Sequence, residues 1–170
     1  MSNDNKLKSI MQKQQKQQKQ SIEKEPDDIL QLVGFIIGNE ELAVPILNIQ
    51  EIIKPIECTK VPSVPDYVLG VFNLRGSILP LIDLRRKFGL PSATQTEDTR
   101  FIVIKTENNE AGFVIDKLTQ AIRINQSDIE TPPETFSKED GVENLIFGIG
   151  KMENSIITIL NVNALLKRDF

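Results

Sequence analysis

The chain aligns with itself at two constant offsets, and this internal repeat constrains the possible folds more than any other feature. Gly70 matches Gly148, 78 residues further on, and the same offset holds without a gap well downstream. Upstream, an offset of 69 pairs residues 44–53 with residues 113–122. A repeat of this kind predicts two similar structural units, with the loops absorbing the difference between the two offsets.

The first unit spans about residues 30–99 and the second about residues 100–168. Each would hold about five short strands in roughly 70 residues, which is the size of a small barrel. A barrel closes its own edges, and closure suits strands this apolar. We therefore expect an all-β fold of two SH3-like five-stranded β-barrel subdomains that pack together, with short helices and a disordered N-terminal tail.

The expected strands are short apolar runs bounded by Gly, Pro, Asn and Asp. One helical step should follow Pro45, and a short helix should end the chain at residues 164–166. The strands are expected at residues 32–37, 42–44, 49–53, 71–74, 78–84, 101–105, 112–115, 118–124, 146–150 and 156–162.

The stretch from Tyr67 to Phe88 predicts a hairpin followed by a helical turn. Arg75-Gly76-Ser77 should form its turn, because Gly76 supplies the positive φ that a tight turn usually needs. Asp83 could cap the helix and Gly89 stands where that helix should end. The second unit has Lys151-Met152-Glu153-Asn154 where the first has Asn73-Leu74-Arg75-Gly76. A structural requirement common to both units therefore does not explain why the first unit has an arginine at position 75. It is a candidate contact to a partner; a solvated turn residue is the alternative.

Composition excludes several classes of function. The formal charge of −4 leaves no basic field for a nucleic acid. The chain has no histidine, the commonest general base and metal ligand, and its single cysteine lacks a second thiol. We therefore expect no enzyme, no metal site and no cofactor. An enzyme built on carboxylates, with Asp83 and Asp116 as its best candidates, is the weaker alternative.

The apolar runs are short and interrupted, which argues against a membrane span. One cysteine, Cys58, cannot form an internal disulfide, which fits a cytoplasmic setting. Residues 1–28 are rich in Gln and Lys and poor in apolar residues, so we expect a flexible tail or a fraying helix. A basic tail that touches acidic partners is the functional alternative.

The hairpin resembles a motif of the CheW family of chemotaxis coupling proteins. The pattern P-x-x-x-x-G-V-x-N-L-R-G-x-I-x-P-x-x-D-L-R runs from Pro65 to Arg85 with little departure. In the second unit, residues 112–116 resemble the family's G-x-V-V-D element and residues 147–150 resemble its later glycine segment. The resemblance covers about residues 30–168 and does not include the tail.

The resemblance implies two five-stranded barrels with a groove between them. It also implies a non-enzymatic adaptor that joins chemoreceptor cytoplasmic tips to the histidine kinase CheA, at receptor arrays on the inner face of the membrane. In the family a receptor helical hairpin packs into the groove, and the kinase's regulatory domain binds through barrel ends. Arg75 matches the family's important arginine, Ile49 and Glu51 match its receptor- or kinase-contacting stretch, and Val114 and Ile115 match positions along the groove. Ile49, Val114 and Ile115 could equally be core residues.

A sister protein with the same domain is a further alternative, either the coupling half of a CheV-type adaptor or the kinase's regulatory domain. Both would normally continue into further domains, and the chain ends at Phe170, so we expect neither. A nucleic-acid-binding barrel is weaker still, given the charge and the single tyrosine.

Overall fold

A computed structural model of the chain describes residues 6, 8–12, 28–132 and 145–168. Most of the predicted tail lies outside these ranges, as does most of the loop expected at residues 131–143. Within the tail, residue 6 and residues 8–12 are helical.

The described residues form mostly strands with short helical turns, as the sequence predicted. The strands are β1 (Ile29–Ile37), β2 (Glu40–Pro45), β3 (Ile49–Ile53), β4 (Val68–Leu74), β5 (Ser77–Asp83), β6 (Arg100–Lys105), β7 (Glu110–Ile115), β8 (Lys117–Asn125), β9 (Ile129–Glu130), β10 (Ile146–Lys151) and β11 (Ile156–Leu160). The helical elements are η2 (Ile46–Asn48), α2 (Leu84–Lys87), η3 (Gln126–Asp128) and α3 (Val162–Leu166). The sequence did not predict β9 or η3.

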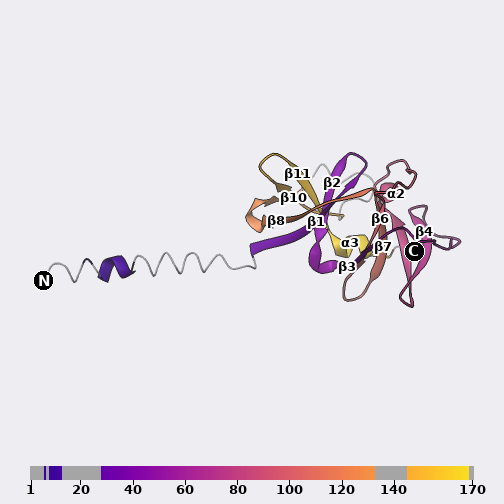
Figure 1. The fold of residues 1–170 in the computed structure, drawn as a ribbon, viewed down its shortest axis with the longest axis horizontal. Coiled ribbons are helices and arrows are strands. Elements are labelled where there is room, and N and C mark those ends of the chain that lie inside the picture. Colours follow the sequence, from indigo (N-terminus) through magenta and orange to yellow (C-terminus); the bar gives the residue numbers. More distant parts are fainter. Residues whose placement is uncertain (1–5, 7, 13–27, 133–144, 169–170) are drawn as a thin grey trace.

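The strands form two sheets that lie side by side, with α3 between them (Figure 1). The six-stranded sheet has the order β8-β1-β2-β11-β10-β9, and the five-stranded sheet has the order β3-β6-β7-β5-β4. Each sheet contains strands from both sides of residue 99. The predicted units, residues 30–99 and 100–168, therefore describe the repeat in the sequence but not the grouping of strands into sheets.

Short connections explain this exchange of strands between the two halves of the chain. A single residue, Asp116, separates β7 from β8, and the three residues of η2 separate β2 from β3. Strands that pair as a hairpin need at least a two-residue turn. Because β7 cannot fold back within one residue, the chain continues out of the five-stranded sheet and enters the six-stranded sheet as β8.

The pairing registers confirm both offsets of the internal repeat. Ile49 faces Ile104 in the five-stranded sheet, and Leu118 faces Phe35 in the six-stranded sheet, with both pairs related by an offset of 69. The parallel pairs are also equivalent: Leu81 faces Gly112 in one sheet and Ile159 faces Ala43 in the other. Here the offset of 78 relates Leu81 to Ile159, and the offset of 69 relates Ala43 to Gly112. The two sheets are thus two copies of one arrangement, and each copy takes its first hairpin from the other half of the chain.

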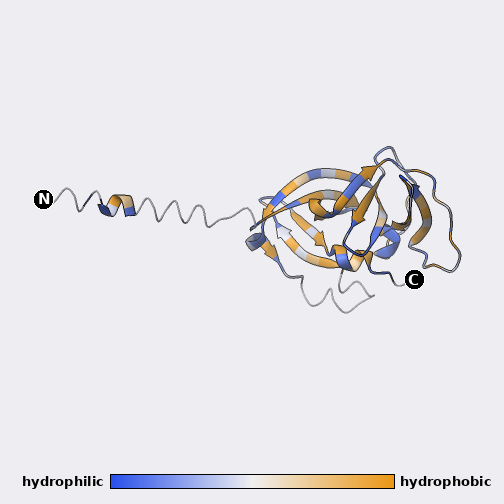
Figure 2. Ribbon diagram, turned by 90° about the horizontal axis from the view of Figure 1, so that it is seen from below, coloured by the Kyte–Doolittle hydropathy of each residue, from blue (hydrophilic) through white to orange (hydrophobic). Residues whose placement is uncertain are grey.

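Buried side chains form three clusters, one within each sheet and a larger one between the sheets. Apolar stretches lie along the strands and polar residues gather at the turns (Figure 2). The cluster between the sheets joins residues of both sheets to α3, and includes Phe35, Val44, Ile102, Phe113 and Leu165. This shared core makes the two sheets one packed body.

Candidate partner-binding surfaces

The hairpin turn between β4 and β5 places Arg75 at the end of the five-stranded sheet. Both turn residues have positive φ, 50° at Arg75 and 89° at Gly76. This combination is typical of the type I′ turn that joins two-residue hairpins. Asn73 Oδ1 accepts a hydrogen bond from the Gly76 N–H at 3.0 Å, which fixes the turn. A non-glycine residue in this region of φ is uncommon, and such residues occur frequently at functional sites.

Arg75 contacts a second predicted site residue across the sheet. Its guanidinium Nη2 lies 2.9 Å from Glu51 Oε1 on β3, while 80% of the Arg75 side chain remains exposed. Ile78, on the strand that leaves the turn, is also exposed. Glu51, Arg75 and Ile78 form what we call the turn surface, which combines a charge pair with an apolar side chain.

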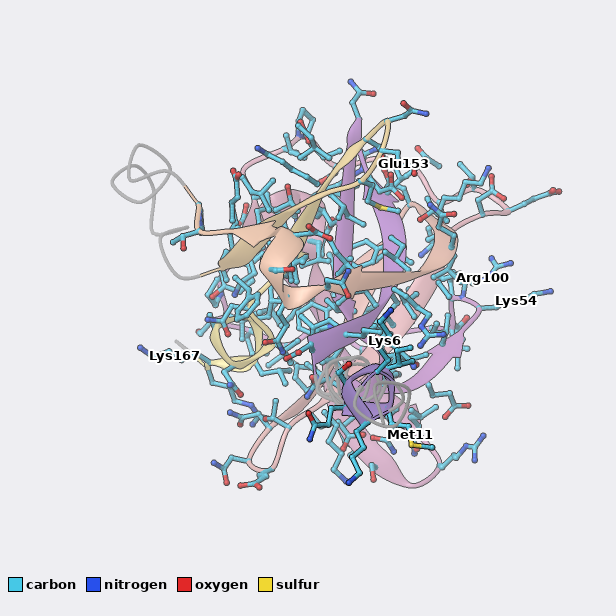
Figure 3. All side chains as sticks on the ribbon, turned by 90° about the vertical axis from the view of Figure 1, so that its left-hand side faces the viewer. Lys6, Met11, Lys54, Arg100, Glu153 and Lys167 are labelled. Carbon is cyan, nitrogen blue, oxygen red and sulfur yellow. The ribbon has the colours of Figure 1, made fainter. Side chains whose placement is uncertain are left out.

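The equivalent turn of the six-stranded sheet has a different chemistry. An offset of 78 places Glu153 where the first copy has Arg75, and Ile156 where it has Ile78. Glu153 lies at the outer end of the hairpin formed by β10 and β11 (Figure 3). Ile78 and Ile156 are both largely exposed. The two ends therefore share an apolar side chain and differ in the sign of the neighbouring charge.

The three aliphatic residues predicted for the groove lie mainly in cores. Ile115 has no exposed surface and belongs to the core between the sheets. Ile49 is partly buried against that core, and Val114 is partly buried against the core of the five-stranded sheet. The apolar space between the sheets is therefore largely filled from within, and Ile115 offers a partner no surface.

An open apolar pocket remains at the rim of the junction between the sheets. It has a volume of about 300 Å³. The six-stranded sheet contributes most of its lining, and the segment after α2, which belongs to neither sheet, contributes the rest. The lining residues are Ile37, Glu40, Leu42, Phe88, Leu90, Ile146, Thr158 and Leu160. We call this the junction pocket.

A charged cluster lies beside the junction pocket. Arg85 Nε lies 2.9 Å from Asp116 Oδ1, and Arg85 Nη2 lies 2.6 Å from Asp116 Oδ2. Asp116 Oδ2 also accepts a hydrogen bond from the Gly38 N–H at 2.8 Å. The fork geometry matches the bidentate pairing that arginine makes with carboxylates.

The cluster keeps Asp116 ionised. Burial alone would raise the pKa of Asp116, but the hydrogen bonds from Arg85 and from the Gly38 N–H, together with the Arg85 charge, outweigh it and lower the pKa below its ordinary 3.8. The hydrogen bond to Asp116 in turn raises the pKa of Arg85.

Sequence reasoning expected a groove between the two units, but for that groove it named none of the residues that line the junction pocket, and it missed the Arg85–Asp116 pair. A signal was present, because Arg85 ends the D-L-R part of the first motif and Asp116 ends the G-x-V-V-D element of the second. Opposite charges at the ends of two apolar motifs are compatible with an ion pair. The two motifs are far apart in the sequence, so no local pattern shows that they meet. Asp83, the other carboxylate considered for an enzyme, caps α2 instead by accepting a hydrogen bond from the Arg85 N–H.

No helix in the described ranges is long and apolar enough to cross a bilayer. Nor do they contain a group of three or more His, Cys, Asp or Glu side chains that could hold a metal ion.

Comparisons with known proteins agree with this geometry. The profile of the CheW-like domain family matches residues 31–170. The chain is 51% identical over 166 residues to chemotaxis protein CheW of Helicobacter pylori, covering 98% of this chain and 99% of that protein. It is 35% identical to chemotaxis protein CheW of Bacillus subtilis, covering 81% of this chain and 87% of that protein. The crystal structure of the scaffolding protein TtCheW from Thermoanaerobacter tengcongensis is similar, with a TM-score of 0.74 and 29% identity over 82% of this chain and 94% of that one. The chain therefore belongs to the CheW-like family of chemotaxis proteins.

Proposed function

We propose that this protein is a non-enzymatic chemotaxis adaptor that couples the cytoplasmic tips of chemoreceptors to the regulatory domain of the histidine kinase CheA. The observation that supports it most is the presence of two different surfaces on one packed body. An adaptor must hold two partners at once, and the turn surface and the junction pocket differ both in chemistry and in the residues that form them. Its place of action is the cytoplasmic face of the membrane, where receptor tips are found.

The receptor occupies the junction pocket in this proposal. An amphipathic helix binds a groove by inserting apolar side chains at helical spacing. The junction pocket is almost wholly apolar and open at the rim, so it suits such an anchor. Glu40 at its edge favours a basic residue close to the anchor on the receptor helix. Ile49 and Val114, on the strands that flank β6, lie outside the lining of this pocket and stay predicted contacts, whereas Ile115 lies in the core behind it.

The kinase binds the turn surface in this proposal. Exposed Ile78 provides apolar area, and Arg75 and Glu51 provide donors and acceptors in a fixed orientation. Arginine at the rim of an interface supplies direction and a charge-assisted hydrogen bond. The strained backbone of Arg75 is consistent with this role, because it holds the side chain at the outermost point of the hairpin.

Reconstitution with both partners tests the proposal. The full chain is mixed with receptor cytoplasmic fragments and CheA, the mixture is sedimented, and kinase activity in the pellet is measured. We expect the chain to join the complex and to raise kinase activity under receptor control. A chain that stays in the supernatant, or that sediments without changing kinase activity, would contradict it.

Substitution of Arg75 by glutamate tests the turn surface. Arg75→Glu should weaken kinase binding by about 1–3 kcal/mol, because a buried acceptor on the partner loses its donor. The fold should persist, since an exposed ion pair such as Arg75–Glu51 contributes less than about 1 kcal/mol. Isothermal titration with the CheA regulatory domain measures the loss.

Lys167→Glu is the matched control for this charge change. Lys167 is exposed and projects away from the body of the molecule (Figure 3). Equal losses of kinase affinity in the two variants would show a general charge effect, and an unchanged affinity in a folded Arg75→Glu protein would remove Arg75 from the interface.

A further inference from the structure

The junction pocket is built from two walls that different sheets position. One wall belongs to the six-stranded sheet, where ladder hydrogen bonds fix the strands. The other wall is the segment Phe88–Leu90, which follows α2 and belongs to no strand. The width of the pocket therefore depends on what holds this second wall against the first.

The backbone of the second wall is tied to α2 alone. The Phe88 N–H donates to Leu84 O at 3.0 Å, and the Leu90 N–H donates to Arg85 O at 2.7 Å. Gly89, with φ of 74°, lets the chain reverse between them. Across the pocket, Leu90 Cδ1 lies 3.6 Å from the position that a Cβ on Gly38 would occupy. Leu90 thus packs against the turn between β1 and β2.

The side chain of Arg85 connects the second wall to that same turn. Its Nη1 donates to Pro91 O, directly after the wall, at 3.3 Å. Its Nε and Nη2 bind Asp116, and Asp116 Oδ2 accepts from the Gly38 N–H. The Asp116 N–H donates in addition to Ile36 O on β1. A continuous set of bonds therefore runs from the end of one wall to the turn that begins the other.

We propose that the Arg85–Asp116 pair is a positioning element for receptor binding: it holds the Phe88–Leu90 wall against the β1–β2 turn and so keeps the junction pocket in a form that accepts a receptor side chain. The inference rests on the proposed receptor site. The pair is not needed to hold the sheets together, because the core between them is extensive and the two side chains are about a quarter exposed, at 23% and 26%. Its loss should release the wall and leave the fold intact.

Affinity measurements on paired variants test the inference. Asp116→Asn removes the charge, and Arg85→Lys keeps a charge but loses the fork. If the wall is correctly placed only a tenth of the time in a variant, the apparent Kd for a receptor cytoplasmic fragment rises about tenfold. Kinase affinity should change by less than about twofold, because the turn surface is built from other residues. Glu130→Gln is the control, since it breaks another ion pair, Lys151–Glu130, that is largely exposed and does not border the pocket.

Amide hydrogen exchange supplies a readout of the wall itself. The Leu90 and Gly38 amides should exchange faster in Asp116→Asn than in the wild type, while amides of the core strand β6 keep their protection. If Asp116→Asn does not fold, Arg85→Lys decides by the same measurements.

The outcomes separate the inference from the function on which it rests. A tenfold loss of receptor affinity with kinase affinity retained supports it. Receptor affinity equal to the control, or a parallel loss for receptor and kinase, overturns it while the adaptor function stands. A wild-type chain that does not bind the receptor fragment overturns both.

Discussion

Asp116 combines three structural tasks in one residue. It is the one-residue link between β7 and β8, its carboxylate binds Arg85, and the same carboxylate caps the Gly38 N–H. The carboxylate therefore joins α2, which follows β5 of the five-stranded sheet, to the turn between β1 and β2 of the six-stranded sheet. A side chain with this many charged and backbone partners affects both stability and its pH dependence.

Protonation of Asp116 should lower stability in acid. The pKa of Asp116 is below its ordinary 3.8 in the folded protein, so the unfolded chain binds the proton more tightly. The stabilisation is therefore fully present above the unfolded pKa and is lost as the pH falls through the lower folded pKa. Urea unfolding of the wild type and of Asp116→Asn measures the difference in unfolding free energy as a function of pH. The linkage relation places the change within roughly pH 3 to 7.

The expected difference between the two proteins is about 1–2 kcal/mol at neutral pH, because bonds to charged groups are worth more than neutral ones but this pair is partly exposed. The difference should shrink below about pH 4, as the wild type loses the charge that the variant lacks. A difference in unfolding free energy that stays constant with pH would contradict the linkage.

At the scale of elements, two helix caps follow the repeat. Asp83 Oδ1 accepts from the Arg85 N–H at the start of α2, and Asn161 Oδ1 accepts from the Ala164 N–H at the start of α3. The self-alignment pairs these two residues, and both helices have a single turn or little more. In so short a helix the cap is one of few bonds that fix its direction.

Removal of the Asp83 cap should be measurable. Asp83→Ala is expected to lower the free energy of unfolding by about 1 kcal/mol, since the Arg85 N–H loses its acceptor. Asp83→Asn keeps the acceptor and removes the ion pair with Arg86, whose Nε lies 3.6 Å from Asp83 Oδ2. Chemical denaturation compares the variants. A loss in Asp83→Asn as large as that in Asp83→Ala would assign the effect to the charge and not to the cap.

At the scale of the whole molecule, the exchanged hairpins make the two halves interdependent. The hairpin of β1 and β2 completes the six-stranded sheet, although it lies in the first half of the chain. The hairpin of β6 and β7 likewise completes the five-stranded sheet. Neither half contains all the strands of either sheet, so neither half can close a barrel or bury the shared core.

Cutting the chain in the exposed loop between β5 and β6 tests this interdependence. Fragments 1–93 and 94–170 should each lack a cooperative unfolding transition when alone, because each half leaves strand edges and apolar faces unpaired. Mixed together, they should regain the circular dichroism spectrum of the intact chain. A cooperative transition in either fragment alone would show that a half folds without its partner.

Much of the local structure was predictable from the sequence. The strands, the Arg75-Gly76 turn, the helical step at η2 and the Asp83 cap follow from residue types whose preferences are local. The binding site was less predictable. Arg75 and Glu51 lie together as an exposed pair, but Ile115 is a core residue, because an aliphatic side chain has the same pattern in a groove as in a core. The junction pocket and its Arg85–Asp116 pair depend on contacts between residues far apart in the chain.

By itself, the sequence determined that two copies of one β arrangement exist, where their strands and turns lie, and which family they belong to. Only the tertiary structure decided which half supplies which hairpin. The two copies have matching registers. Strand preferences alone would therefore let each sheet pair either with the hairpin of the same half of the chain or with the equivalent hairpin of the other half. The one-residue link at Asp116 contributes to this choice, because a single residue cannot turn the chain back, so β8 leaves the sheet that contains β7.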